Sequence, residues 1–510
     1  MRKINKLLTI GFSAALLMFS CTKDFESINT NLNAPEQISD PSLLLPGIIW
    51  DAANRNMAES FYVYGVLADQ FEENYMSSFT NFTRDFSSGQ SWANNGMIKN
   101  IYYMIDLSQK QGLANYQATG LILKSWIFLR ITDSYGPIPY TEAGRANEGI
   151  NFPKYDSQET IYAGLLKDLE TANSLLGTTT ELMPGDILYN GNTQNWKKFA
   201  NSLSLRILLR QSGRKDPSVA MQKIIGNPST YPIFTSNKDQ AALQYLNKRE
   251  NSHPIFLKQP SNWQGSEQLT QNLEVILKSM NDPRLAVFAM PTPASVTTGG
   301  APQYFGVPNG LQQAETTSWN GGVKNQSTLG LLWAPEQFSL EFASPNSAQS
   351  VFMPYSELEF ILAEAKEKGY ITTGDAQTYY MNGIKDQFEY YASRIPSNFV
   401  LPTAAMVIPP SSYYTQTNVA YTGTQTEKLH KIYTQKWLSL FFCGSEAWAE
   451  WRRVGVPTII PGPNTNGYVP VRLLYPADEM LQNEANYKEA VKMLGGEGDA
   501  LTTRVWWDID

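Results

Sequence analysis

Cysteine and histidine are scarce in this chain, whose 510 residues include only two of each. Two cysteines cannot build a disulfide scaffold, and so few thiol and imidazole groups exclude a zinc cluster made from Cys and His. Charge is also low, because Asp, Glu, Lys and Arg make up 17% of the residues and the formal net charge is −7. This balance argues against an electrostatic nucleic-acid binder. Aromatic residues, in contrast, are abundant, with 12 Trp, 27 Tyr and 23 Phe.

Long apolar runs are absent as well, since no segment after the N-terminus has 18 consecutive apolar residues. The chain begins with a basic stretch followed by apolar residues 7–19, which are too short to span a bilayer as a helix. We interpret residues 1–20 as a signal peptide. Cys21 follows directly, as in a bacterial lipobox, and is the predicted lipidation site at the start of a polar tether over 21–42. The alternative is an ordinary secretory signal with an unmodified cysteine.

The second cysteine, Cys443, has no partner in the chain if Cys21 carries lipid. It follows the apolar residues Leu440, Phe441 and Phe442. We therefore expect Cys443 to be a buried and unreactive thiol.

The dominant pattern is the 3.6-residue period of amphipathic helices, as in Ile161, Leu165 and Leu169. Strand content is expected to be minor. The predicted helices cover residues 43–75, 92–111, 115–133, 157–176, 194–212, 264–280, 355–369, 373–392, 425–443, 445–454 and 484–494.

Eight of these helices form four adjacent pairs, which suggest a tetratricopeptide-like (TPR-like) stack although the strict 34-residue repeat is missing. The sequence thus predicts a mainly all-α fold. The four pairs cover residues 92–133, 157–212, 355–392 and 425–454.

Two long segments break the helical pattern. Residues 291–335 contain seven Gly, five Pro and only two charged residues, and residues 395–426 contain no charged residue at all. Both are nonetheless rich in aromatic rings, which normally pack against something. Loops of this length inside a domain are often functional, so the segments are candidates for ligand binding.

The order of short motifs along the chain resembles the SusD/RagB family of nutrient-binding outer-membrane lipoproteins. The most specific match runs Gly444-Ser445-Glu446-Ala447-Trp448-Ala449-Glu450-Trp451-Arg452-Arg453. Further matches lie at residues 28–35, 44–48, 133–140, 195–206, 281–285, 357–365, 432–438, 454–457, 471–476 and 504–508.

This resemblance implies a SusD-like domain over 43–510, built as a right-handed bundle of four TPR-like helix pairs with a variable insertion at about 213–353. It also implies a lipid-anchored outer-membrane protein that binds a nutrient, most simply an oligosaccharide, and passes it to a SusC-like TonB-dependent transporter. A RagB-like peptide receptor is the first alternative. A passive helical scaffold is another.

Candidate ligand-binding residues combine aromatic rings with amides, because sugars offer apolar C–H faces together with hydroxyl groups. The 291–335 segment supplies Tyr304, Trp319 and Asn320, and a second set holds Arg84, Trp92 and Asn95. The spacing of Trp92 and Asn95 resembles the aromatic and amide pair of starch-binding family members. The structural alternative is that Trp92 only packs at the start of a helix.

A catalytic constellation is not evident, and we predict no enzyme activity and no cofactor. The chain has no P-loop, dinucleotide-binding or nucleophile-elbow motif. Glu446 and Glu450 are expected to form structural ion pairs with Arg452 and Arg453. A glycoside hydrolase using two carboxylates is the enzymatic alternative, although the sequence nominates no such pair. Some relatives bind calcium, but no EF-hand spacing indicates such a site here.

Overall fold

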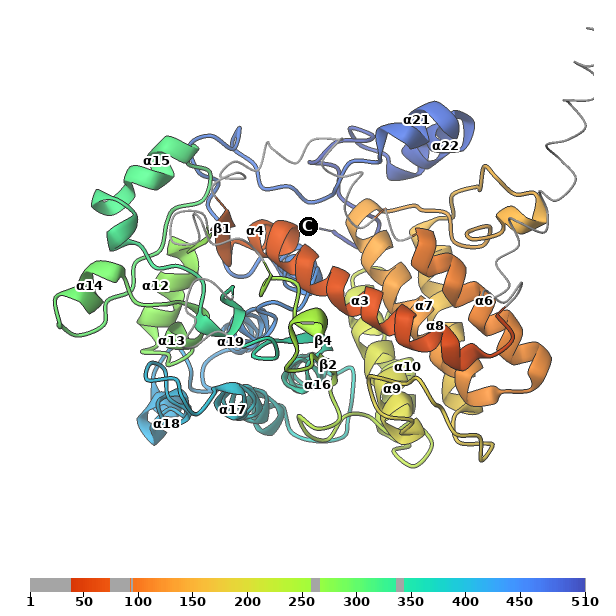
Figure 1. Ribbon diagram of the computed structural model, residues 1–510, viewed down its shortest axis with the longest axis horizontal. Helices are drawn as coiled ribbons and strands as arrows, with labels where there is room; N and C mark the ends of the chain where they lie inside the picture. Colours follow the sequence, from red (N-terminus) through yellow and green to blue (C-terminus); the bar gives the residue numbers. More distant parts are fainter. Residues whose placement is uncertain (1–37, 74–91, 93–94, 258–266, 336–343, 510) are drawn as a thin grey trace, which may run out of the picture.

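The structure is a computed structural model that describes residues 38–73, 92, 95–257, 267–335 and 344–509. Within these ranges helices dominate, in agreement with the predicted all-α class. A first group lies on the right of Figure 1 and consists of α6 (Asn95–Gln111), α7 (Ala114–Tyr135), α8 (Gln158–Leu175) and α9 (Thr193–Arg210). A second group consists of α16 (Tyr355–Glu367), α17 (Ala376–Arg394), α19 (Gln425–Ser439) and α20 (Glu446–Val454).

Consecutive helices are in contact in both groups. The pairs α6–α7, α8–α9, α16–α17 and α19–α20 pack together, as the sequence predicts. The groups are joined where α16 contacts α9 and where α20 contacts α7. The stacking of these pairs as a TPR-like array stays a prediction.

Helix α3 (Leu45–Glu59) crosses the front of the molecule in Figure 1. It contacts α6 and also the strand β4 (Gln349–Met353), which pairs antiparallel with β2 (Ala241–Gln244). The side-chain amide of Asn56 donates to the Val351 carbonyl oxygen at 2.9 Å. Helix α3 thereby connects the first helical group to the strand that directly precedes α16.

The predicted helix over 43–75 ends earlier than expected. After α3 the chain passes through a π-helical turn at Ser60–Tyr64 and a last turn, α4 (Gly65–Leu67), and Asp69 then takes a left-handed conformation with φ of 55°. The next residues form β1 (Phe71–Glu73). A left-handed residue ends a helix, so the apolar period across this point is misleading.

A similar correction applies to the predicted helix over 264–280. Its described part begins as β3 (Glu267–Leu269), which pairs antiparallel with β1, and only then becomes α12 (Gln271–Ser279). Thr270 separates the two elements, and its hydroxyl accepts the backbone N–H of Leu273 as the helix N-cap. A three-residue strand is too short to show the alternation that identifies strands in a sequence.

The remaining elements form a loop-rich lobe and a C-terminal pair of short helices. The lobe lies on the left of Figure 1 and includes α13 (Leu285–Phe288), α14 (Pro293–Thr297) and α15 (Gln313–Ser318). The C-terminal pair, α21 (Ala477–Gln482) and α22 (Glu484–Leu494), lies at the upper right. Three further short helices are α10 (Ser218–Ile225), α18 (Ala404–Val407) and a 3₁₀ turn at Ser411–Thr415.

The uncharged segment 395–426 packs against the helical core. Tyr413 is buried, and its hydroxyl donates to Asp282 Oδ2 at 2.6 Å. Its ring contacts Phe388 edge to face. These contacts give this aromatic ring a structural role.

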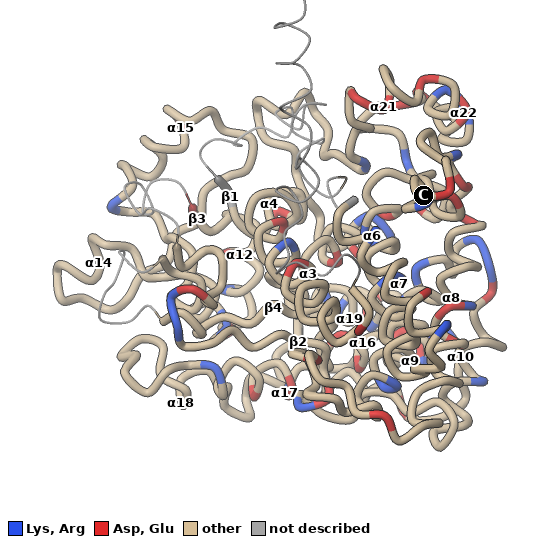
Figure 2. The backbone as a smooth tube through the Cα atoms, turned by 45° about the vertical axis from the view of Figure 1, so that its right-hand side comes forward, with Lys and Arg blue, Asp and Glu red and all other residues tan. Residues whose placement is uncertain are grey.

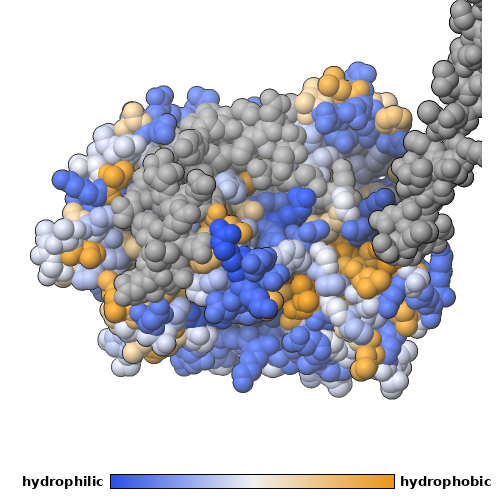
Figure 3. All heavy atoms as spheres, viewed as in Figure 1, coloured by the Kyte–Doolittle hydropathy of each residue, from blue (hydrophilic) through white to orange (hydrophobic). Residues whose placement is uncertain are grey.

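Hydrophobic residues on the face seen in Figure 3 form small, separate patches among hydrophilic ones. None of the helices in the described ranges is long and apolar enough to cross a bilayer.

Cys443 is buried as predicted, with 6% of its surface exposed. Burial raises the pKa of its thiol well above the usual range. We expect a thiol reagent such as Ellman's reagent to leave Cys443 unmodified in the folded protein and to react once the chain is unfolded, because the attacking species is the thiolate. Rapid labelling of the native protein at neutral pH would contradict the buried environment.

Candidate functional site

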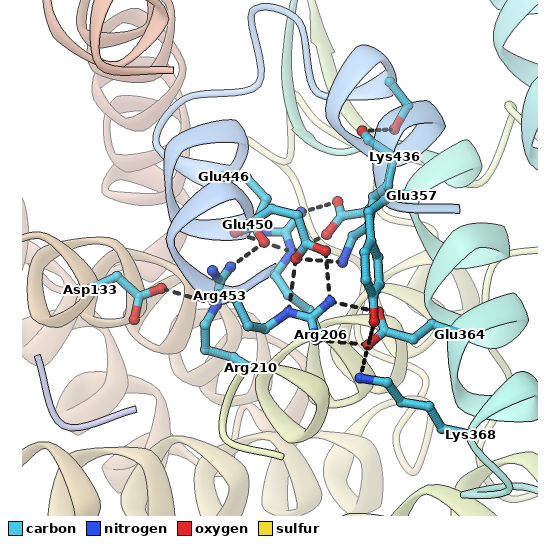
Figure 4. Close-up of polar contacts among 12 residues, drawn as sticks. Asp133, Arg206, Arg210, Glu357, Glu364, Lys368, Lys436, Glu446, Glu450 and Arg453 are labelled. Atoms are coloured by element: carbon cyan, nitrogen blue, oxygen red, sulfur yellow. Dashed lines mark hydrogen bonds and ion pairs between the residues drawn. The ribbon is translucent and has the colours of Figure 1, made fainter. Parts of the chain in front are cut away.

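The most specific motif of the sequence lies in a buried network of ion pairs between helices (Figure 4). Glu446, on α20, pairs with Arg210 and with Arg206, both on α9. Arg206 in turn donates from Nε to Glu357 Oε1 at 2.7 Å. The expected role of Glu446 in ion pairing is correct, but its partners belong to another helix pair.

Glu450 is the second acidic residue of this motif. It accepts from Lys436 Nζ at 2.9 Å and from Arg453 Nε at 3.1 Å. Arg453 also donates to Glu364 at 2.8 Å. Arg452, in contrast, forms no ion pair with the two glutamates and donates to the backbone carbonyl oxygens of Asp133 and Val471. The predicted pairing is thus right for Arg453 and wrong for Arg452.

The environment of these carboxylates favours a structural role. Burial acts to raise the pKa of Glu450, but Arg453 and Lys436 outweigh it and hold that pKa well below the usual range. Burial raises the pKa of Asp133 although Arg210 and Arg452 oppose the rise. Both carboxyl groups are almost completely shielded from solvent and engaged in polar contacts. Within the described ranges, no three His, Cys, Asp or Glu side chains are arranged to hold a metal ion.

Trp92 lies three residues before α6 and is half-buried in a cluster of tyrosines. Its ring centroid is 5.1 Å from that of Tyr135, 5.8 Å from that of Tyr475 and 6.1 Å from that of Tyr155. Its indole N–H donates to Glu479 Oε1 on α21 at 3.3 Å. Packing against these tyrosines therefore covers much of the Trp92 side chain, as expected from the alternative that Trp92 has a structural role.

A cavity of about 340 Å³ nevertheless adjoins Trp92. Ile98, Phe128 and Ile138 contribute to its apolar wall, and Lys99 is among the polar residues that line it. Apolar walls with a few polar groups are typical of small-molecule sites. Of the residues predicted beside Trp92, Asn95 is the first residue of α6, whereas Arg84 lies outside the described residues, as does Cys21.

Trp319 lies on a tight turn that directly follows α15, and 36% of its surface is exposed. The turn is fixed by reciprocal hydrogen bonds of 3.0 Å, in which the amides of Asn320 and Asn325 each donate to the other's backbone carbonyl oxygen. Gln326 also donates from its side chain to the Trp319 carbonyl oxygen. The predicted residue Asn320 therefore orients the turn, and the backbone of Trp319 is held in place.

Tyr304 belongs to the same lobe but is more enclosed. Its backbone carbonyl oxygen accepts from Lys278 Nζ at 2.6 Å, and burial raises the pKa of its hydroxyl to about 12. The neighbouring Phe305 exchanges hydrogen bonds with Ser327, so the segments of Tyr304 and Trp319 are tied into one local structure.

The two aromatic sets lie on different parts of the molecule. Trp319 follows α15, Trp92 contacts α21, and these helices lie at opposite ends of the upper edge in Figure 1. Figure 2 shows that charged residues are sparse around α14 and α15 and frequent in the helical groups. The sequence thus identified a lobe of low charge, but its aromatic candidates form two separate sets.

A further feature, missed by the sequence analysis, is a polar groove along α12. Cavities of about 330 and 580 Å³ share Asn272 and Thr458 in their linings and are therefore adjacent. Asp69, at the left-handed position after α4, lines the smaller one. We refer to these two cavities together as the α12 groove. No motif could have indicated it, because its residues come from distant segments.

Comparison with known proteins identifies the family. The family model described as "Starch-binding associating with outer membrane", SusD-like, matches residues 32–476. No curated protein matches the chain at a significant level.

Several solved structures share the fold. An outer membrane protein from Bacteroides vulgatus associated with nutrient binding is 28% identical with a TM-score of 0.77, and the alignment covers 92% of this chain and 100% of the other. A SusD homologue from Bacteroides fragilis is 24% identical with a TM-score of 0.78, and 92% and 99% of the chains are covered. A chitin-binding protein is 25% identical with a TM-score of 0.76 over 92% and 100% of the chains.

Two of these relatives are named for binding, one of a nutrient and one of chitin, which agrees with the expectation that the chain is not an enzyme. The match to the family model spans most of the chain, and the solved structures reproduce its fold. The chain therefore belongs to the SusD-like family of nutrient-binding proteins associated with the outer membrane.

Proposed function

We propose that this protein captures an oligosaccharide at the cell surface and delivers it to a SusC-like TonB-dependent transporter. Family membership supports a nutrient-binding role, and the chitin-binding relative is an example of saccharide recognition on this fold. The transporter partner follows from the resemblance to SusD and RagB proteins.

The exposed ring of Trp319 is the observation that carries the saccharide proposal. A sugar ring can stack its C–H face on an indole whose backbone is already fixed, and little conformational entropy is then lost on binding. The surrounding lobe has few charges, which suits a neutral ligand. Asn320 follows Trp319 in the same turn, and Tyr304 belongs to the same lobe. Trp92 with Asn95 and Arg84 forms the second candidate set.

Calorimetric titration with oligosaccharides and peptides is the direct test. We expect Trp319→Ala to weaken saccharide binding at least about tenfold, the equivalent of roughly 1.4 kcal/mol, because the stacking surface is lost. Tyr103→Ala is a suitable control, since Tyr103 is 38% exposed on α6 and lies outside both aromatic sets. Binding of peptides alone would overturn the saccharide proposal and favour a RagB-like receptor.

Attachment to the membrane is proposed to occur through lipid on Cys21. One acyl chain gives only marginal binding, whereas several chains anchor a protein stably. Incorporation of labelled palmitate by the wild-type chain, and its loss in Cys21→Ser, would support this anchor. Delivery to the transporter predicts that the two proteins copurify from solubilised outer membranes, and repeated failure to copurify under mild detergent would contradict that step.

A further inference from the structure

The α12 groove contains a buried carboxyl group, that of Asp69, with one oxygen that lacks a hydrogen bond to the described residues. Asp69 is 1% exposed, and its Oδ1 accepts from the Asn309 side-chain amide at 3.1 Å. Its other oxygen, Oδ2, has no hydrogen-bond partner among the described residues. Buried polar atoms are almost always paired, so an unpartnered carboxylate oxygen beside a cavity needs an explanation.

The backbone around Asp69 is also in an uncommon state. Its φ of 55° lies in the left-handed region, where Gly is favoured. The position is held firmly, because the Thr270 hydroxyl donates to the Asp69 carbonyl oxygen at 2.6 Å and the Trp437 indole donates to that of Ala68 at 3.2 Å. Strained residues that are fixed by their surroundings often belong to binding sites.

Asn272 faces the same cavity from the first turn of α12. Its side-chain amide lies close enough to the Asp69 carboxyl to act against the rise of that group's pKa. Its buried Nδ2 nevertheless makes no hydrogen bond of normal geometry to any described residue. An acceptor on Asp69 and a donor on Asn272 thus lie near each other in the lining of one cavity, and neither atom has a hydrogen bond of normal geometry to a described residue. This pair complements a ligand that both donates and accepts hydrogen bonds, as vicinal hydroxyl groups do.

The groove offers little positive charge to an anionic ligand. Among the described residues that line the two cavities, Lys431 is the only Lys or Arg, and its ammonium group donates to the carbonyl oxygens of Ala420 and Thr422. The Glu427 carboxylate is occupied too, because it accepts from Thr424 in the capping box of α19. In the smaller cavity, Asp69 is the only Asp or Glu among the described lining residues.

Apolar side chains complete the groove. Val275 is 56% exposed and Ile460 is 76% exposed, and both line the cavity beside Asp69. The two cavities, of about 330 and 580 Å³, fall within the range of roughly 300–1,000 Å³ that is usual for small-molecule sites. Exposed apolar surface next to amides suits the C–H and O–H groups of a sugar.

We propose that the α12 groove is a second binding site, separate from Trp319 and Trp92, for an uncharged saccharide whose vicinal hydroxyl groups donate to Asp69 Oδ2 and accept from Asn272 Nδ2. The site goes beyond the proposed aromatic platform and does not depend on it. Two sites on one chain would hold a longer glycan at two points or two short ones independently.

Saturation-transfer NMR with the mature chain can test this site, using maltotriose, cellotriose and triacetylchitotriose as probes. We expect at least one probe to bind a Trp92→Ala/Trp319→Ala double variant and to lose most of this residual signal when Asp69→Asn is added. Asn272→Ala in the first turn of α12 provides a second test, and Asn100→Ala on the exposed surface of α6 is its control.

The outcomes separate the two proposals. Loss of all binding in the double aromatic variant would overturn the second site and leave the aromatic site intact. Unchanged binding in both Asp69→Asn and Asn272→Ala would also overturn the second site, as would the absence of signal from all three probes with the wild-type chain. Unchanged binding in the double aromatic variant together with loss in Asp69→Asn would overturn the aromatic platform instead.

Discussion

Replacing Glu450 by Gln is expected to destabilise the protein by about 3–5 kcal/mol, because the change removes the charge that compensates buried cations. Lys436 is 2% exposed and donates to Glu450 at 2.9 Å, so the variant leaves its ammonium group in a desolvated position without this carboxylate. Arg453 retains Glu364 as a partner. Chemical denaturation near neutral pH, monitored by circular dichroism, measures the decrease in the free energy of unfolding.

The pH dependence of this variant has a defined sign. The pKa of Glu450 is held below its usual range in the folded protein, so the carboxylate stabilises the fold above the ordinary glutamate pKa. This contribution disappears as the pH falls toward the lowered pKa. The difference between the wild type and Glu450→Gln should therefore be largest at neutral pH and should narrow in acid.

An exposed ion pair provides the control. Glu484 and Lys488 are one helical turn apart on α22, with side chains that are 62% and 63% exposed. Glu484→Gln should change stability by no more than about 0.5 kcal/mol, because water solvates both partners. A loss for Glu450→Gln as small as that for Glu484→Gln would contradict the structural role of the buried network.

The helix pairs could be predicted from the sequence because their signals are local. In α19, for example, Thr424 and Glu427 form the capping box that opens the helix, and the helical period continues after them. The prediction of a helix failed over the described residues 68–73 because the apolar pattern continues across the helix end. Only the left-handed conformation of Asp69 and the pairing of β1 with β3 show where the helix stops.

The binding candidates were harder to predict because burial is a property of the whole fold. Trp92 and Trp319 are the same type of residue in the sequence. In the fold, however, Trp92 packs among tyrosines from three other segments, whereas Trp319 is exposed on a turn. The same reason explains why Glu446 was assigned the wrong arginine. Its partners on α9 are more than 230 residues away in the sequence, at a separation of 236 for Arg210.

The α12 groove is the extreme case of this difficulty. Asp69, Asn272 and Asn309 are common polar residues, and no periodicity or spacing connects them. Their importance appears only when the fold buries the carboxyl group and places the amides beside it. A site of this kind has an energetic cost that can be measured without knowing the ligand.

Asp69→Asn is expected to stabilise the protein by about 2–4 kcal/mol near pH 8, whatever its effect on binding. Burial raises the pKa of this carboxyl from 3.8 to about 7, although the hydrogen bond from Asn309 and the nearby Asn272 oppose the rise. The folded chain therefore binds this proton more tightly than the unfolded chain, and ionisation of Asp69 costs folding free energy. Asn is nearly isosteric, tolerates the left-handed backbone and can still accept from Asn309.

The sign of this pH dependence follows from the raised pKa of Asp69 in the folded protein. Below the unfolded pKa both states are protonated and the two proteins should be about equally stable. As the pH rises to 7 and above, the wild type loses stability relative to the variant, by at most roughly 4 kcal/mol for a pKa change of this size. Denaturation curves at about pH 4 and about pH 8 should therefore diverge only at the higher pH.

Asp375→Asn is the matched control. Asp375 caps α17, and its pKa is lowered because the backbone N–H and the hydroxyl of Thr378 donate to it. Asp375→Asn should therefore not stabilise the folded protein at alkaline pH. If Asp69→Asn failed to gain stability as the pH rises, Asp69 would not be a destabilising buried charge. A gain in stability together with loss of saccharide binding would instead show that the protein retains a costly carboxyl group for recognition, the trade-off expected of a binding site.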